Sequence, residues 1–212
     1  MVNVMKRLFT AFAFAALTLS AAEWKQLFNG KDLAGWKMTG PGNFKVEGGE
    51  MVTEGGMGLL YYTGQKFGAG TLRVVFKATT DHDNSGVIIR LPDAPPDPWY
   101  GVHNGYEVQI DARGDEWHST GALYSLSKVS SRRQKGVGEW NTMDIVLDGQ
   151  KTVVLLNGEK VNEFMGNQEV PPRKQWYEPI RGPRPDSGYI GLQNHDKNSS
   201  VHFKEISFKP GK

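Results

Sequence analysis

The feature that most constrains the fold is a two-residue alternation of apolar and polar side chains, repeated in short runs. Residues 71–77 place Leu72, Val74 and Phe76 on one side of an extended chain, and residues 106–111 alternate in the same way. This pattern is typical of half-buried β-strands. After residue 22, no stretch of ten residues keeps a helical pattern, because glycine and proline interrupt every candidate. We therefore expect an all-β protein.

Turn sequences divide the rest of the chain into further strands. Asp148-Gly149-Gln150 and Asn157-Gly158 each separate two apolar runs and predict two successive hairpins. The other expected strands share the same alternation and cover residues 143–147, 151–156, 160–164, 188–193 and 201–208. Short strands joined by turns predict a sandwich of two antiparallel sheets, and 212 residues are compatible with one such domain.

Two segments do not fit the strand pattern and are expected to be long loops, residues 91–105 and 166–187. Long loops in a compact domain are often functional. The alternative is that both are solvated insertions at the surface.

The N-terminus resembles a secretory signal peptide. Lys6 and Arg7 precede an uncharged run from residue 8 to 19, and small residues end at Ala22. The run is short for a membrane span, and the alternative is an uncleaved anchor or a core helix. We expect cleavage after Ala22, a domain of residues 23–212, a periplasmic or secreted location, and no stable membrane anchor after cleavage.

Charge and cysteine content exclude several classes of function. Lys6 and Arg7 are two of the 25 basic residues, and without them basic and acidic residues balance at 23 each. A neutral domain without a long basic run gives no indication of a nucleic-acid partner. The chain has no cysteine, which excludes disulfides, zinc–thiolate sites and cysteine nucleophiles.

The strand at residues 106–111 carries the most informative group of polar side chains. Glu107, Gln109 and Asp111 share one face, while Val108 and Ile110 point the opposite way, into the core. Three acceptors in a row suit a sheet that binds a polyhydroxylated ligand. The alternative is an ordinary solvent-facing strand.

The same strand argues against a retaining glycosidase. The Cα atoms of Glu107 and Asp111 would lie about 13 Å apart at the usual strand rise. Covalent retention needs carboxyl groups roughly 5–5.5 Å apart. One base and one helper describe this pair better than a nucleophile and an acid.

Other polar residues supply further candidates. Arg90 could hold an anionic oxygen through its guanidinium group or form a strand-end salt bridge. Residues 81–84 could bind a hard cation such as calcium, but a polar turn is favoured because the spacing matches no EF-hand. His118 and His195 lack the spacing of a zinc motif. Exposed tryptophans would suit stacking on sugars.

Seven segments stand together in one order: residues 27–36 (LFNGKDLAGW), 84–90 (NSGVIIR), 105–111 (GYEVQID), 120–124 (TGALY), 138–141 (GEWN), 156–158 (LNG) and 191–195 (GLQNH). In this order they resemble the 3-keto-disaccharide hydrolase domain family, from about Trp24 to Phe208. The histidine-glycine that usually follows the glutamine appears here as Asn194-His195-Asp196, so the local turn is expected to differ.

The resemblance implies a concanavalin A-like lectin/glucanase jelly roll that acts on glycosides oxidised at C3. A C3 ketone acidifies the C2 proton, so a base can form an enolate that expels the C1 substituent. For this chemistry we expect Glu107 or His195 as base, Arg90 or a divalent cation as enolate stabiliser, and Asp111 as orienting residue or acid. The residues expected to bind the sugar are Asn84, Gln109, His118, Tyr124, Trp140 and Gln193.

Two other functions use the same features. A non-catalytic carbohydrate-binding module would bind unmodified glycans with the same polar face. A laminarinase-like glycoside hydrolase would share the fold but would need a second long carboxylate in place of Gln109 or Asp111. If the protein is the 3-keto-glycoside enzyme, we expect a functional link to an oxidoreductase that forms the ketone.

Overall fold

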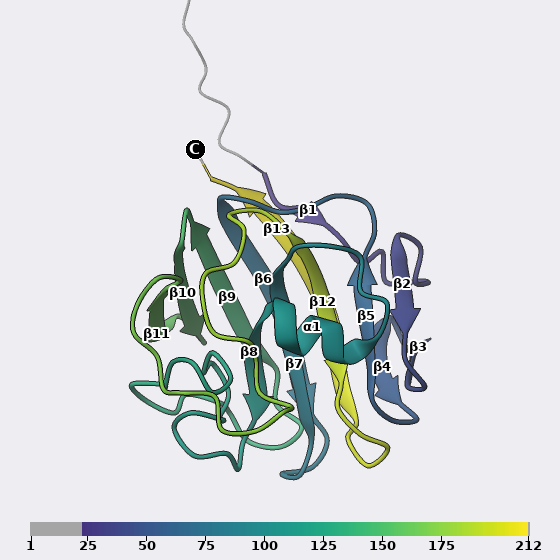
Figure 1. The fold of residues 1–212 in the computed structure, drawn as a ribbon. Helices are drawn as coiled ribbons and strands as arrows, with labels where there is room; N and C mark the ends of the chain where they lie inside the picture. The colour runs from purple at the N-terminus through teal and green to yellow at the C-terminus, as the bar shows by residue number, and fades with distance from the viewer. Residues whose placement is uncertain (1–22, 212) are drawn as a thin grey trace, which may run out of the picture.

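The computed structural model describes residues 23–211, which form one β-sandwich with a single short helix among them (Figure 1). The expected signal peptide, residues 1–22, lies outside the described residues. Within the described chain, no helix has the length and apolar character needed to cross a membrane.

The two sheets of the sandwich are antiparallel throughout. The larger sheet has the order β11-β10-β9-β6-β13-β4-β3, and β1 also pairs with β13. Its strands are β1 (Lys25–Gln26), β3 (Asn43–Glu47), β4 (Glu50–Glu54), β6 (Gly70–Ala78), β9 (Asn141–Asp148), β10 (Lys151–Leu156), β11 (Glu159–Met165) and β13 (Val201–Pro210). The smaller sheet has the order β2-β5-β12-β7-β8, with β2 (Trp36–Thr39), β5 (Gly58–Tyr62), β7 (Asn84–Leu91), β8 (Tyr106–Asp111) and β12 (Tyr189–Asn194).

The core lies between the sheets and follows the two-residue alternation of the strands. Leu72, Val74 and Phe76 of β6 pack into the same apolar cluster as Val108 and Ile110 of β8, and all five side chains are fully buried. The alternation therefore predicts correctly which face of each of these strands packs in the apolar core.

Both predicted hairpins are confirmed. β9 pairs with β10 around Asp148-Gly149-Gln150, and β10 pairs with β11 around Asn157-Gly158. Asn157 and Gly158 have φ angles of 54° and 86°, the left-handed region that asparagine and glycine tolerate in such turns.

The segment expected to be a loop at residues 91–105 contains helix α1 (Pro98–Asn104). The Asp97 side chain accepts a hydrogen bond from the Tyr100 N–H at 2.9 Å, and Pro98 occupies the first turn. The helix lies across the outer face of the smaller sheet (Figure 1). Gly101 permits this approach, because an added Cβ would lie 2.5 Å from Leu59 Cδ2. α1 therefore forms a raised wall on this face.

Candidate functional site

A cavity of about 660 Å³ opens on the outer face of the smaller sheet, beside α1. Strands β7, β8 and β12 form its floor, and α1 and the loops around residues 118–124 and 174–178 form its walls. The residues that line it are Met57, Asn84, Trp99, Val102, Glu107, Gln109, Asp111, His118, Tyr124, Lys174, Gln175, Tyr177, Glu178, Gln193 and His195. Eight of the ten residues expected at a site are among them, whereas Arg90 and Trp140 are not.

The floor is polar because β8 presents Glu107, Gln109 and Asp111 away from the core. Gln109 donates from Nε2 to Asn84 Oδ1 at 3.0 Å, and Asn84 donates from Nδ2 to Asp111 Oδ2 at 3.2 Å. Asp111 also accepts the Arg113 backbone N–H at 2.8 Å. These hydrogen bonds fix the side chains of Gln109, Asn84 and Asp111 relative to one another. Asp111 acts as an acceptor in both of its bonds.

Two carboxamide side chains on the cavity floor have oxygen atoms that accept no hydrogen bond from the described residues. The Oε1 atoms of Gln109 and Gln193 are buried and have no hydrogen-bond partner among the described residues. Buried polar atoms normally have a partner, so these two oxygens are suited to hydroxyl donors of a bound ligand.

Glu107 is the most strongly perturbed acid of the cavity. Its side chain is 4% exposed, and burial raises its pKa to about 8, although a hydrogen bond with the Gln193 amide lowers it in part. The carboxyl lies over Gly86, where an added Cβ would come within 2.5 Å of Glu107 Oε1. A carboxyl of this kind is protonated at neutral pH and can donate a proton.

Tyr124 and His118 form one wall together. Their rings meet edge to face with centroids 5.3 Å apart. Burial, with the nearby Glu107, raises the pKa of Tyr124, so its phenol stays a neutral donor. His118 is held between Asp115 Oδ1, 2.6 Å from Nδ1, and Ser125 Oγ, 3.1 Å from Nε2.

His195 follows β12 and pairs with the next residue. Its Nδ1 lies 2.8 Å from Asp196 Oδ2, which fixes the ring and leaves Nε2 available. Burial raises the pKa of Asp196, but hydrogen bonds from His195, the Asn198 N–H and Ser199 outweigh this and leave the pKa below its ordinary value. Asp196 is therefore a carboxylate that can orient an imidazole.

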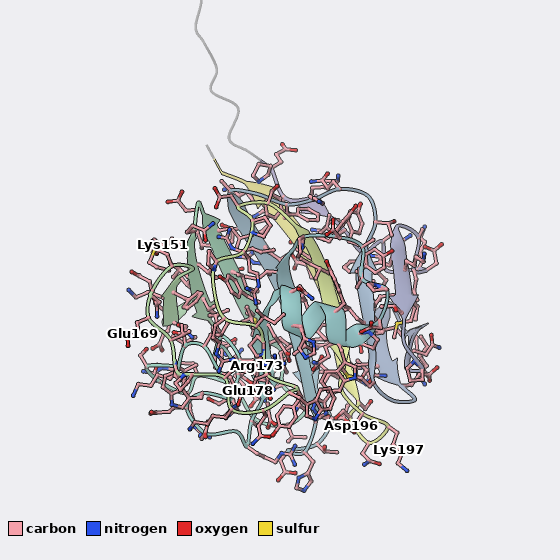
Figure 2. The ribbon with its side chains drawn as sticks, in the orientation of Figure 1. Lys151, Glu169, Arg173, Glu178, Asp196 and Lys197 are labelled. Atoms are coloured by element: carbon pink, nitrogen blue, oxygen red, sulfur yellow. The ribbon has the colours of Figure 1, made fainter. Side chains whose placement is uncertain are left out.

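Glu178 is a cavity residue that sequence analysis did not identify. It belongs to the loop of residues 166–187, where Arg181 Nη2 lies 2.7 Å from its Oε2 and the Lys174 N–H donates to the same oxygen at 3.1 Å. Figure 2 shows Glu178 and Asp196 toward the same end of the molecule, below α1 in that view. Only the length of the loop pointed to a role for this segment.

The expectation that Arg90 stabilises an enolate is wrong, because a β-bulge turns its side chain away from the cavity. Ile89 and Arg90 together lie opposite the single residue Ile190, and Arg90 has a φ angle of 55°. Its guanidinium reaches the larger sheet and donates to Lys151 O at 3.0 Å. It also donates to the carbonyls of Pro185 and Asp186. Arg90 thus connects the two sheets.

This position predicts a structural effect of Arg90→Met. The variant keeps an apolar stem but leaves buried carbonyls without donors, which should cost about 1–3 kcal/mol of unfolding free energy. Urea unfolding at pH 7 measures this loss, and an unchanged midpoint would contradict the assignment.

The expected sugar contact of Trp140 is also wrong, since this residue lies on the other side of the sandwich. It precedes β9, and its ring lies 4.4 Å from Lys77 Nζ and 4.3 Å from Lys204 Nζ. These lysines belong to β6 and β13 of the larger sheet. Trp140 therefore packs with cations on the outer face of that sheet.

The candidate calcium ligands at residues 81–84 form a polar turn, as favoured. Asp83 is buried and accepts backbone N–H groups of Thr79, Thr80 and Ser200 at 2.6, 2.9 and 3.0 Å. Within residues 23–211, no group of three or more His, Asp or Glu side chains is arranged to hold a metal ion. The divalent cation stays a prediction.

Comparison with known proteins places this cavity in context. Residues 23–209 match the family model of the 3-keto-alpha-glucoside-1,2-lyase-like domain. A protein from Parabacteroides distasonis, assigned provisionally as a glycosyl hydrolase, has a similar structure with 25% identity and a TM-score of 0.73, covering 89% of this chain and all of that one. No curated protein sequence matches the chain.

More distant structures share the fold. A galectin-like protein of unknown function from Bacillus subtilis aligns with a TM-score of 0.65 at 10% identity, over 90% of this chain and 96% of that one. The carbohydrate-binding module CBM66 of the same organism aligns with a TM-score of 0.56 at 13% identity, over 82% and 95%. The expected jelly-roll fold is confirmed, and the family match indicates a carbohydrate-active protein.

Proposed function

Because the chain belongs to the family of 3-keto-alpha-glucoside-1,2-lyase-like domains, we propose that it cleaves 3-keto-glycosides by eliminating the C1 substituent. The observation that carries this proposal is the buried carboxyl of Glu107, whose pKa burial raises to about 8, in a cavity that His195 also lines. An elimination needs an acid and a base in one cavity, and Glu107 and His195 both line this one.

The reaction follows from the ketone at C3. A base takes the proton from C2, and the C2–H electron pair forms an enolate with the C3 carbonyl. The enolate collapses into a C1=C2 double bond while the C1–O bond breaks, and the departing oxygen takes a proton from an acid. Water can afterwards add across the double bond, which gives net hydrolysis.

His195 is the better candidate for the base, since Asp196 holds Nδ1 and leaves Nε2 to accept the C2 proton. Glu107 then serves as the acid for the departing oxygen. Tyr124 donates its neutral hydroxyl to the enolate oxygen, while Gln109 and Gln193 accept sugar hydroxyls. Asp111 keeps a supporting role through its bond with Asn84.

The direct test is incubation of the purified protein with methyl 3-keto-α-glucoside, with and without a chelator, and with methyl α-glucoside in parallel. We expect release of methanol and an unsaturated or hydrated 3-keto sugar from the oxidised substrate alone. Binding of both sugars without any product would favour a carbohydrate-binding module. Cleavage of the unoxidised glucoside would favour a glycosidase that uses Glu178 as its second carboxylate. Turnover that is seen without the chelator and lost with it would indicate that the reaction needs the divalent cation.

Gly86 offers a test of how Glu107 is positioned. Gly86→Ala places a Cβ against the Glu107 carboxyl, so the side chain must shift. We expect kcat/KM to fall about tenfold, because proton transfer depends on sub-ångström placement. Gly68→Ala is the control, since its added Cβ would meet only ordinary contacts at 3.5 Å. Equal kinetics for both variants would show that the carboxyl position does not matter.

Two wider proposals accompany this function. The substrate ketone must be formed by an oxidoreductase that acts on the C3 hydroxyl of a glucoside, so we propose a functional link to that class of enzyme. We also propose that the protein acts in the periplasm or outside the cell, as the N-terminal sequence predicts.

A further inference from the structure

A group of exposed aromatic side chains stands at the edge of the cavity. Trp99 of α1 and Tyr177 line the cavity, and Trp176 packs against Trp99 with ring centroids 4.7 Å apart. Their exposed fractions are 36% for Trp99, 62% for Trp176 and 39% for Tyr177. We call these three residues the aromatic rim. Contiguous apolar surface of this kind marks an interaction site more often than a packing defect.

The aromatic rim rests on a well-connected frame. His103 Nε2 lies 2.9 Å from Trp176 O, and the Ile180 N–H donates to His103 O at 3.1 Å. Arg181 donates to the carbonyls of Pro171 and Pro179 at 2.9 and 2.6 Å. The backbone that carries Trp176 and Tyr177 is therefore held in place before a ligand arrives, which lowers the entropic cost of binding.

The rings stand at steep angles to one another. The planes of Trp99 and Trp176 differ by 55°, and those of Trp176 and Tyr177 by 80°. Aromatic pairs prefer edge-to-face or offset geometry, so an angled group of rings can contact a planar aromatic guest with both faces and edges.

We propose that the aromatic rim binds the group released from C1, and that this group is a planar aromatic aglycone. This inference rests on the proposed function, which places the sugar on the polar floor. Beside Tyr177 the cavity is lined by the polar residues Lys174, Gln175 and Glu178, but on the Trp99 side it is lined by Met57 and Val102, whose side chains offer no partner for hydroxyl groups. An aromatic leaving group loses no hydrogen bonds there, whereas a second sugar does.

Three substrates separate aromatic recognition from leaving-group reactivity. Methyl, cyclohexylmethyl and benzyl 3-keto-α-glucosides release alcohols of similar acidity, so differences in kcat/KM report contacts with the released group. We expect kcat/KM for the benzyl substrate to be about tenfold higher than for the methyl substrate. It should also be severalfold higher than for the cyclohexylmethyl substrate. Equal values for benzyl and cyclohexylmethyl, or a higher value for a 3-keto-disaccharide, would overturn the proposed substrate class.

Two variants assign the effect to the aromatic rim. Trp176→Ala changes the most exposed ring and should reduce the benzyl-to-methyl ratio about fivefold, whereas Trp140→Ala on the opposite face should leave the ratio unchanged. If no 3-keto-glucoside reacts, the proposed function fails. In that case, calorimetry measures the affinities for benzyl and methyl α-glucoside. Equal affinities would refute the proposal that the aromatic rim binds an aromatic group.

Discussion

Glu107→Gln should lower kcat/KM for methyl 3-keto-α-glucoside by about 10²- to 10⁴-fold, the usual contribution of a general acid or base. Glutamine keeps the size and most hydrogen bonds of the side chain but has no proton to give to the departing oxygen. The loss should appear mainly in kcat, since sugar binding by Gln109, Gln193 and Asn84 does not need the proton. Initial rates over a range of substrate concentrations separate the two parameters.

The pH dependence gives an independent measurement of the same role. Because burial raises the pKa of Glu107 to about 8, the acid form is lost as pH rises through that value. The wild-type rate should therefore decline above about pH 8, and the residual rate of Glu107→Gln should show no such decline. Glu163→Gln, at an exposed position on β11, is the matched control and should keep the wild-type profile. Near-wild-type turnover by Glu107→Gln would remove this residue from the mechanism.

The parts of the fold that could be predicted are those fixed by local sequence. Alternation in β6 and β8 sets which side chains face the apolar core, and Asn157-Gly158 sets a tight turn, so these elements follow from neighbouring residues. Helix α1 could not be predicted by periodicity, because seven residues hold too few turns of a helix for a pattern. Its only local indications are Asp97 as N-cap and Pro98 in the first turn.

The distinction between local and long-range determinants also explains which residues of the candidate site could be predicted. Glu107, Gln109 and Asp111 reach one cavity because strand geometry fixes their common face. Arg90 follows the same alternation in sequence, yet the bulge that reverses it depends on pairing with β12, a strand about one hundred residues away. The path of the loop that carries Glu178 depends on contacts with distant segments, such as those of Arg181 Nη2 with Ser125 O and of the Ile180 N–H with His103 O. Such long-range determinants leave no local pattern.

The electrostatic cost of burying Glu107 should also appear in stability. The pKa of the carboxyl is raised from 4.5 to about 8 on folding, so the folded state binds the proton more tightly than the unfolded state. Stability must then fall as pH rises between these two values, because the unfolded chain ionises first. Above about pH 8 the folded state carries the full cost of a buried carboxylate.

Glu107→Gln removes this cost, so the variant should gain stability relative to the wild type as the solution becomes more alkaline. From the two pKa values, the difference in unfolding free energy should grow by about 4 kcal/mol between pH 5 and pH 9. Urea unfolding of both proteins at several pH values measures it. Glu163→Gln should show no such growth, because ion pairs with Lys160 and Lys151 lower the pKa of Glu163. A difference that stays constant from pH 5 to pH 9 would mean that Glu107 is already ionised at neutral pH, and a residue without its proton cannot be the acid of the elimination.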